Sequence, residues 1–180
     1  MAIMLQYSFG AGDTPLFSTF HGHPDRSGKC FEYRLHLVVV VMPFSFDIEV
    51  ASGVIAQSVW LHDDAGHNQD ASREMRDLFP GDPFGTPKPE KLLHVLLHIA
   101  TNPGDLVLDS FAGSGTTGAV AHKMGRRWIM VELGEHCHTH IIPRLKKVID
   151  SEDKGGVTES VNWQGGGGFR YYSVAPSLII

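Results

Sequence analysis

The sequence predicts an α/β protein, because apolar segments with helical spacing alternate with short apolar strands over its second half. Apolar residues recur at helical spacing over 89–100, and a short strand follows at 106–108. A glycine-rich loop then leads into a helix at 119–124, a second strand at 128–131 and a helix at 141–149. This order predicts a parallel βαβ unit with a right-handed crossover.

Local signals set the bounds of these elements. Pro89 suits the first turn of a helix, and the segment 102–105 stops that helix. Gly125 is expected to end the second helix as its C′ residue, and Pro143 marks the start or a kink of the last one. After a run of glycines, the aromatic segment 169–174 predicts a further strand.

The first 57 residues carry fewer structural signals. One strand is expected there, over Leu35–Met42, which includes four successive valines. The polar, acidic stretch that follows predicts a short helix over Ser72–Leu78 with Ser72 as its N-cap. We therefore divide the chain into an unassigned segment, 1–57, and a region with a readable ligand site, 58–180.

Charge and composition exclude several classes of protein. The 180 residues hold 15 Lys+Arg against 20 Asp+Glu, so the formal net charge of −5 argues against gripping nucleic acid by bulk charge. Two cysteines, Cys30 and Cys137, are too few for a disulfide framework or a zinc ribbon. No secretory signal and no apolar stretch of about 20 residues is visible, so we expect a cytoplasmic protein that does not enter a membrane.

The segment Asp109–Gly118 (DSFAGSGTTG) is the clearest candidate for a ligand site. It follows the first predicted strand of the βαβ unit and opens the next helix, which is where open α/β sheets bind their ligands. Gly113 and Gly115 allow a tight turn and close approach of a ligand. The N-terminus of the following helix adds free N–H groups and the positive end of its dipole.

Three ligands compete for this loop. A nucleoside triphosphate would require a lysine near the end of the loop, and none is present. The glycine spacing, with Glu132 19 residues after Gly113, fits a dinucleotide such as NAD. S-adenosylmethionine is the third: Asp109 suits its ammonium group, and Glu132 suits its ribose hydroxyls.

Several motifs in the same order resemble the C-terminal, cofactor-binding part of the amino-group DNA methyltransferases of the β arrangement. They are most similar to the modification subunits of type III restriction systems and to site-specific adenine methyltransferases. The motifs are Thr86–Pro89 with its Lys-Pro pair, the DxFAGSGTT-like Asp109–Thr117, Trp128–Glu132, Leu133–His136, Pro143–Val148 and Gly168–Tyr171.

The resemblance implies a partial Rossmann-like fold of the S-adenosylmethionine-dependent methyltransferases, with a mostly parallel sheet flanked by helices. It implies S-adenosylmethionine as cofactor and methylation of adenine N6 at specific DNA sites, in a restriction-modification system. It also implies a set of cofactor-binding residues: Lys88, Pro89, Asp109, Phe111, Ala112, Gly113, Ser114, Gly115, Thr116, Thr117 and Glu132.

Within that set the resemblance assigns different roles. The backbone of 111–115 would cradle the methionine part, and Thr116 and Thr117 would contact its carboxylate. Glu132 would hold the ribose, and Lys88 with Pro89 would close the methionine end. Phe111 either packs on the cofactor or fills the core.

The catalytic loop of the family is missing from the sequence. Family members hold the target base with an Asp/Asn-Pro-Pro-Tyr-type loop, yet the ten prolines include no Pro-Pro pair, and Asp82-Pro83-Phe84 is interpreted as a turn. We therefore expect no catalytic residue in this chain and no activity of the chain alone. DNA and a chain that supplies the missing loop and target recognition are the expected partners. The alternatives are a non-catalytic binding module and, less favoured, an NAD-dependent oxidoreductase fragment.

The segment His136–His140 contains three histidines and Cys137, all of which are good metal ligands. No further ligand group lies nearby in the sequence, and the resemblance requires no metal there. We therefore expect no metal site.

Overall fold

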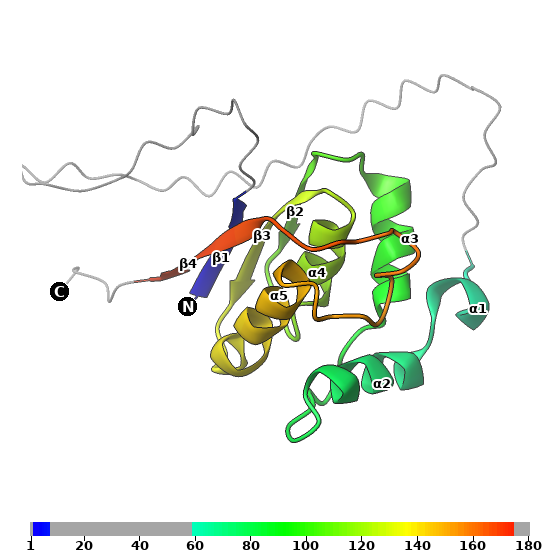
Figure 1. Cartoon of the computed structure of the whole chain (residues 1–180), viewed down its shortest axis with the longest axis horizontal. Helices are drawn as coiled ribbons and strands as arrows, with labels where there is room; N and C mark the ends of the chain where they lie inside the picture. The colour runs from blue at the N-terminus through cyan, green and yellow to red at the C-terminus, as the bar shows by residue number, and fades with distance from the viewer. Residues whose placement is uncertain (1, 8–58, 175–180) are drawn as a thin grey trace, which may run out of the picture. The chain divides into compact units, whose positions relative to one another are not determined.

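The computed structural model describes residues 2–7 and 59–174, and Figure 1 shows their arrangement. The strand expected over Leu35–Met42 and the cysteine Cys30 lie outside the described residues. In chain order the elements are β1 (Ala2–Tyr7), α1 (His62–Ala65), α2 (Asn68–Leu78), α3 (Glu90–Ala100), β2 (Leu106–Asp109), α4 (Thr116–Lys123), β3 (Arg127–Glu132), the π-helical turn η1 (Cys137–Ile141), α5 (Ile142–Ile149) and β4 (Gly168–Ser173).

The four strands form one mixed sheet in the order β2-β3-β1-β4. Only β2 and β3 run parallel, while β1 is antiparallel to both β3 and β4. The expectation of a mostly parallel sheet is therefore wrong for the described strands. Strand β1, which the sequence did not reveal, fills the place between β3 and β4, and its Met4 is paired with Met130 and with Tyr171.

The predicted parallel unit is confirmed as β2–α4–β3. Helix α4 ends at Lys123 with Met124 as its C-cap, and Gly125 follows with φ +73°, a left-handed conformation that suits glycine at a helix end. Helix α5 begins directly after η1 and has Pro143 in its first turn, as expected. Pro89 lies one residue earlier than predicted, as the N-cap of α3.

Helix α2 begins four residues before the predicted start, and its N-cap is His67 rather than Ser72. His67 Nδ1 accepts from Asp70 N at 3.3 Å, and His67 N donates to Asp70 Oδ2 at 3.1 Å, which makes a reciprocal capping box. Ser72 lies inside the helix and donates to Asn68 O. Histidine is not a usual N-cap residue, so the sequence pattern pointed to the serine instead.

The core lies between one face of the sheet and the helices α4 and α5. Met4, Trp128 and Met130 are fully buried on the sheet side of this core, and Val120 and Leu145 are buried on the helical side. Figure 1 shows α4 and α5 lying against the same face of the sheet.

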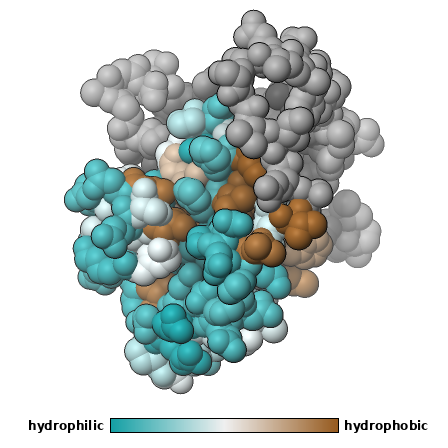
Figure 2. Space-filling view, turned by 90° about the vertical axis from the view of Figure 1, so that its right-hand side faces the viewer, coloured by the Kyte–Doolittle hydropathy of each residue, from teal (hydrophilic) through white to brown (hydrophobic). Residues whose placement is uncertain are grey.

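The opposite face of the sheet is apolar but uncovered by described residues. Leu106 and Leu108 of β2 are 53% and 56% exposed, and Tyr172 of β4 is also exposed. On helix α3, Leu97 is buried, whereas Leu96 and Ile99 are exposed. Figure 2 shows the α3 side of the molecule as a hydrophilic surface interrupted by groups of apolar side chains. Among the described helices, none has the length and apolar character needed to cross a lipid bilayer.

A buried histidine links α4 to the sheet and to the glycine run before β4. Trp128 Nε1 donates to His122 Nδ1 at 3.3 Å, so the proton of the neutral ring is on Nε2, which donates to Gly166 O at 2.9 Å. Burial lowers the pKa of His122, more strongly than the bond to Gly166 raises it.

We predict that the free energy of unfolding decreases as the pH falls below about 6.5, the ordinary histidine pKa. In this range His122 is protonated in the unfolded chain but stays neutral in the folded protein, where its pKa is lowered. Urea unfolding at pH 7.5 and pH 5.5 measures this loss. His122→Gln should reduce the pH dependence, whereas His62→Gln, at an exposed position, should leave it as in the wild type. An equal pH dependence in His122→Gln would exclude His122 as its source.

Candidate functional site

The glycine-rich loop turns from β2 into α4 through two left-handed glycines. Gly113 has φ +55°, and Gly115, the N-cap of α4, has φ +76°. Gly115 N donates to Ala112 O at 2.7 Å, which closes the turn. A Cβ on Gly115 would lie 3.0 Å from Ile141 Cγ2, and one on Gly118 would overlap the side chain of Met130. Conformation and close packing therefore both require glycine here.

Carboxylates at the ends of the two parallel strands hold this loop. Asp109 Oδ1 accepts from Phe111 N at 3.0 Å. Glu132 Oε2 accepts from Gly113 N at 2.8 Å, across 19 residues of sequence. The structure thus brings together the two acidic residues and the glycine loop, as the sequence spacing predicted.

Glu132 is kept ionised by hydrogen bonds. Its Oε1 accepts from Leu133 N at 2.8 Å and from Gly134 N at 2.9 Å. Partial burial opposes ionisation, but the bonds from Gly134, Gly113 and Leu133, together with the nearby His136, lower the pKa of Glu132. Both lone pairs of Oε1 are used. Oε2 accepts from Gly113 N and keeps one further acceptor position, because His136 Nε2 lies 3.2 Å away without making a hydrogen bond.

Two large apolar side chains are exposed to solvent at the same end of the sheet. Phe111 is 90% exposed and Leu133 is 82% exposed. The alternative in which Phe111 fills the core is therefore wrong, and its ring is available to a ligand. Phe111 and Leu133 therefore expose apolar surface beside the glycine loop.

The threonine that opens α4 faces inward rather than toward a ligand. Thr116 Oγ1 accepts from Arg144 Nη1 at 2.8 Å, lies 3.0 Å from Ser114 Oγ, and bonds Lys88 O at 3.3 Å. Ser114 and Thr116 are both buried, as are Ala112 and Pro89, while Lys88 is exposed and Thr117 is half-buried. The bond to Lys88 O joins the Lys-Pro segment to the glycine loop.

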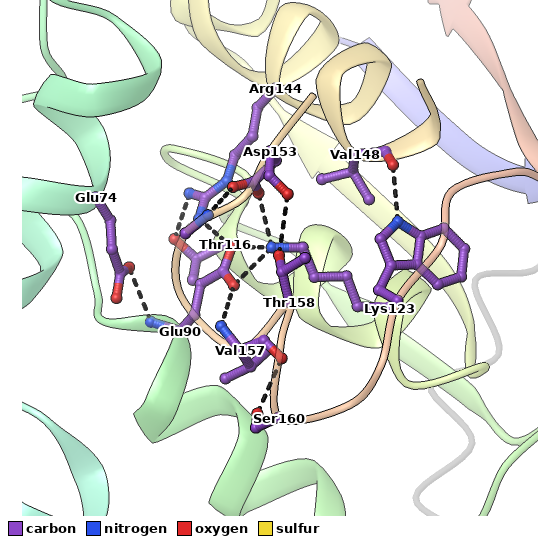
Figure 3. A network of polar contacts seen from close by, with 12 residues as sticks. Glu74, Glu90, Thr116, Lys123, Arg144, Val148, Asp153, Val157, Thr158 and Ser160 are labelled. Atoms are coloured by element: carbon purple, nitrogen blue, oxygen red, sulfur yellow. Dashed lines mark hydrogen bonds and ion pairs between the residues drawn. The ribbon is translucent and has the colours of Figure 1, made fainter. Parts of the chain in front are cut away.

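Four charged side chains are buried together next to Thr116, the first residue of α4, as Figure 3 shows. Lys123 Nζ contacts Glu90 Oε2 at 2.8 Å and Asp153 Oδ2 at 2.7 Å, and Arg144 Nη2 contacts Glu90 Oε1 at 2.9 Å. Two carboxylates face two cations, so the cluster is neutral overall. We call Glu90, Lys123, Arg144 and Asp153 the buried charge cluster. The attraction of Arg144 and Lys123 lowers the pKa of Glu90 despite its burial, which acts in the opposite direction and is the largest single effect.

The sequence alone does not reveal this cluster. Its members come from α3, α4, α5 and the following loop, and each has the appearance of an ordinary charged residue on an amphipathic helix or in a turn. Glu90 also accepts from Val157 N at 3.0 Å, so the cluster fixes the chain after α5 as well.

Glu74 of α2 lies at the edge of the cluster, where its Oε2 accepts from Glu90 N at 3.1 Å. Burial and the charge of Glu90 raise the pKa of Glu74 to about 7, although the bond from Glu90 N and the charges of Arg144 and Lys123 oppose the shift. A cavity of about 340 Å³ opens beside it. The cavity is lined by Glu74, Asp77, Leu78, Glu90, Glu152, Asp153, Lys154, Gly155 and Gly156, and none of these belongs to the glycine loop.

The histidines of 136–140 do not converge on one point. His136 faces Glu132, His138 Nε2 lies 3.2 Å from Tyr171 Oη, and His140 Nε2 lies 2.7 Å from Asp82 O. Over residues 2–7 and 59–174, no group of His, Cys, Asp or Glu side chains is arranged to hold a metal ion.

Comparison with known proteins identifies the family to which the chain belongs. The model of the N6/N4 methyltransferase family, described as DNA methylase, matches residues 33–143. The match begins within the segment that the sequence left unassigned and includes the whole glycine loop.

Three curated relatives are each similar to part of the chain. The probable Mod subunit of the HindVI type III restriction-modification enzyme of Haemophilus influenzae is 53% identical over 89 residues, which are 49% of this chain and 12% of that protein. DNA adenine methyltransferase YhdJ of Escherichia coli is 49% identical over 61 residues (34% and 20%). Type II methyltransferase M.BamHI of Bacillus amyloliquefaciens is 46% identical over 74 residues (40% and 17%). The chain therefore spans at most a fifth of the length of these relatives.

We predict that Glu74→Gln stabilises the protein at pH 8 but not at pH 4. A carboxyl with a raised pKa contributes stability below its unfolded value of 4.5, and this contribution is lost as the pH rises through its folded value of about 7. Glutamine keeps an acceptor for Glu90 N and carries no charge. Since Glu74 is only partly buried, the expected gain is about 1–2 kcal/mol, measured by urea unfolding at both pH values. Asp77→Asn on the same helix is the control, and an equal gain for Glu74→Gln at pH 4 would contradict the prediction.

Proposed function

We propose, from the premise that this chain belongs to the DNA methylase family, that its described region is the S-adenosylmethionine-binding part of a DNA methyltransferase. The proposed substrate is the N6 amino group of adenine at specific DNA sites, in a restriction-modification system. The names of the Haemophilus and Escherichia relatives support this choice.

The observation that carries the proposal is the pair of carboxylates around the glycine loop. The donor set fits the proposed cofactor: Glu132 keeps one acceptor position for a ribose hydroxyl, and Asp109 lies half-buried where an ammonium group can be paired. The first N–H groups of α4 suit a carboxylate. When bound, S-adenosylmethionine supplies an electrophilic methyl group on a sulfonium centre.

The residues of this chain then divide the work of holding the cofactor. Because the Thr116 hydroxyl bonds inward, we propose that Thr116 acts on the cofactor carboxylate through its backbone N–H, and Thr117 through the same helix end. The Phe111 ring, exposed beside the loop, packs on the cofactor, and the backbone of Ala112–Gly115 cradles it. Lys88 and Pro89 close the methionine end, since Lys88 O bonds Thr116 Oγ1.

No residue of this chain supplies the contact to the target base, because the sequence contains no Asp/Asn-Pro-Pro-Tyr loop. We propose that a partner segment supplies that loop and recognises the DNA, and that the chain is inactive alone. Within the described sheet, β2 has a free edge and exposed Leu106 and Leu108, which support pairing with a further strand.

A DNA substrate and the free thiol of Cys137 favour a cytoplasmic location.

Methyl transfer from radiolabelled S-adenosylmethionine to unmethylated duplex DNA tests the proposed function. The chain alone should give no transfer. A chimera in which its matching residues replace the 89-residue matching region of the Haemophilus Mod subunit should methylate adenine. The same chimera with Asp109→Ala is the matched control and should lose activity. Turnover by the isolated chain would contradict the missing loop, and a folded but inactive chimera would contradict the assigned function.

A further inference from the structure

The side chain of Arg144 connects the buried charge cluster to the glycine-rich loop. Its Nη1 donates to Thr116 Oγ1 at 2.8 Å and to Ser114 O at 3.3 Å, and its Nη2 donates to Glu90 Oε1 at 2.9 Å. Figure 3 shows the guanidinium reaching from α5 between Glu90 and Thr116. Arg144 is fully buried, so it cannot touch a ligand in this structure.

We propose that Arg144 is a positioning residue for the cofactor loop, and that it acts through Thr116 and Ser114 rather than on the cofactor. The inference rests on the proposed function of the loop. A guanidinium donates in fixed directions, so an Arg144 held by Glu90 fixes the two loop groups that it contacts.

The conformation of the loop explains why a bond from Arg144 is needed to hold it. Two glycines with left-handed backbone angles, Gly113 and Gly115, leave the backbone of the loop with little intrinsic stiffness. The loop has its own bonds from Gly113 N to Glu132, at the end of β3, and from Gly115 N to Ala112 O, within the loop. Arg144 adds the anchor on the helix side. Without it, Ser114 and Thr116 keep only each other and Lys88 O among the bonds described above.

Glu90 makes this anchor rigid, because its carboxylate is itself held by two groups besides Arg144. Both of its oxygens contact Lys123 Nζ, and Val157 N donates to its Oε2 at 3.0 Å. The loop is therefore fastened to α3, α4 and the segment after α5 through a single guanidinium. Preorganisation of this kind favours binding, since less ordering is required when the ligand arrives.

Hydrogen exchange of the cofactor-free protein tests the proposal. Thr116→Val removes the shorter of the two bonds from Arg144 to this region, and it leaves the bond to Ser114 O and the ion pair with Glu90 in place. We expect the exchange rates of the Gly113 and Gly115 amides to rise about tenfold. The Arg127 amide, bonded to Asp105 O outside the loop, should exchange as in the wild type, which separates local loosening from general destabilisation. Thr116→Ser keeps the hydroxyl and should restore wild-type exchange.

Two further variants complete the experiment. Glu90→Gln/Arg144→Met removes one charge of each sign and should also loosen Gly113 and Gly115. Lys147→Met on the same helix removes a contact to Leu78 O, away from the loop, and should change neither amide. Unchanged exchange of Gly113 and Gly115 in Thr116→Val and in the folded double variant would overturn the proposal.

Calorimetric titration with S-adenosylmethionine then separates this proposal from the proposed function. Thr116→Val should bind about tenfold more weakly than Thr116→Ser. Adding the charge-balanced pair Glu90→Gln/Arg144→Met to Thr116→Val should weaken binding little further, because all these changes remove the same connection between Arg144 and Thr116. Additive losses would mean that Arg144 acts elsewhere and would contradict the proposal. A wild-type chain that binds no S-adenosylmethionine would contradict the proposed function, while the exchange experiment would still decide the role of Arg144.

Discussion

The arrangement of the helices depends on one neutral group of four buried charges, contributed by three helices and the loop after the last of them. Removing one member would leave its partner charged and buried, which typically costs about 3–5 kcal/mol. Lys123, whose side chain is fully buried, lies between Glu90 and Asp153, and Arg144 lies between Glu90 and the glycine loop. The same interactions that order the helices therefore also hold Ser114 and Thr116, on the buried side of the candidate cofactor site.

The front of that site is built by the chemistry of strand ends. Parallel strands β2 and β3 bring Asp109 and Glu132 to one edge, and the turn between β2 and α4 passes between them. Both carboxylates accept backbone N–H groups of the loop, so they shape the loop before any ligand is present. The exposed ring of Phe111 and the first N–H groups of α4 complete a surface that suits a cationic, hydroxyl-rich ligand with a carboxylate.

The parts of this structure that depend on local sequence could be predicted, and those that depend on distant contacts could not. Glycine spacing, strand-end acids and helical periodicity are local, so the βαβ unit, its loop and β4 followed from the sequence. Strand β1 could not be predicted to lie between β3 and β4, because its six residues are paired with segments more than 120 residues away. The buried charge cluster escaped notice because Lys123 and Arg144 occupy helical positions whose burial only tertiary packing decides.

The most direct test of the central claim, a cofactor site already formed in this chain, is a titration of the ¹⁵N-labelled protein with S-adenosylmethionine, followed by amide chemical shifts. The account predicts saturable shifts at Phe111–Thr117 and around Glu132, with small changes at β4, and no such response to NAD. Shifts absent from the glycine loop, or the same response to NAD, would contradict it.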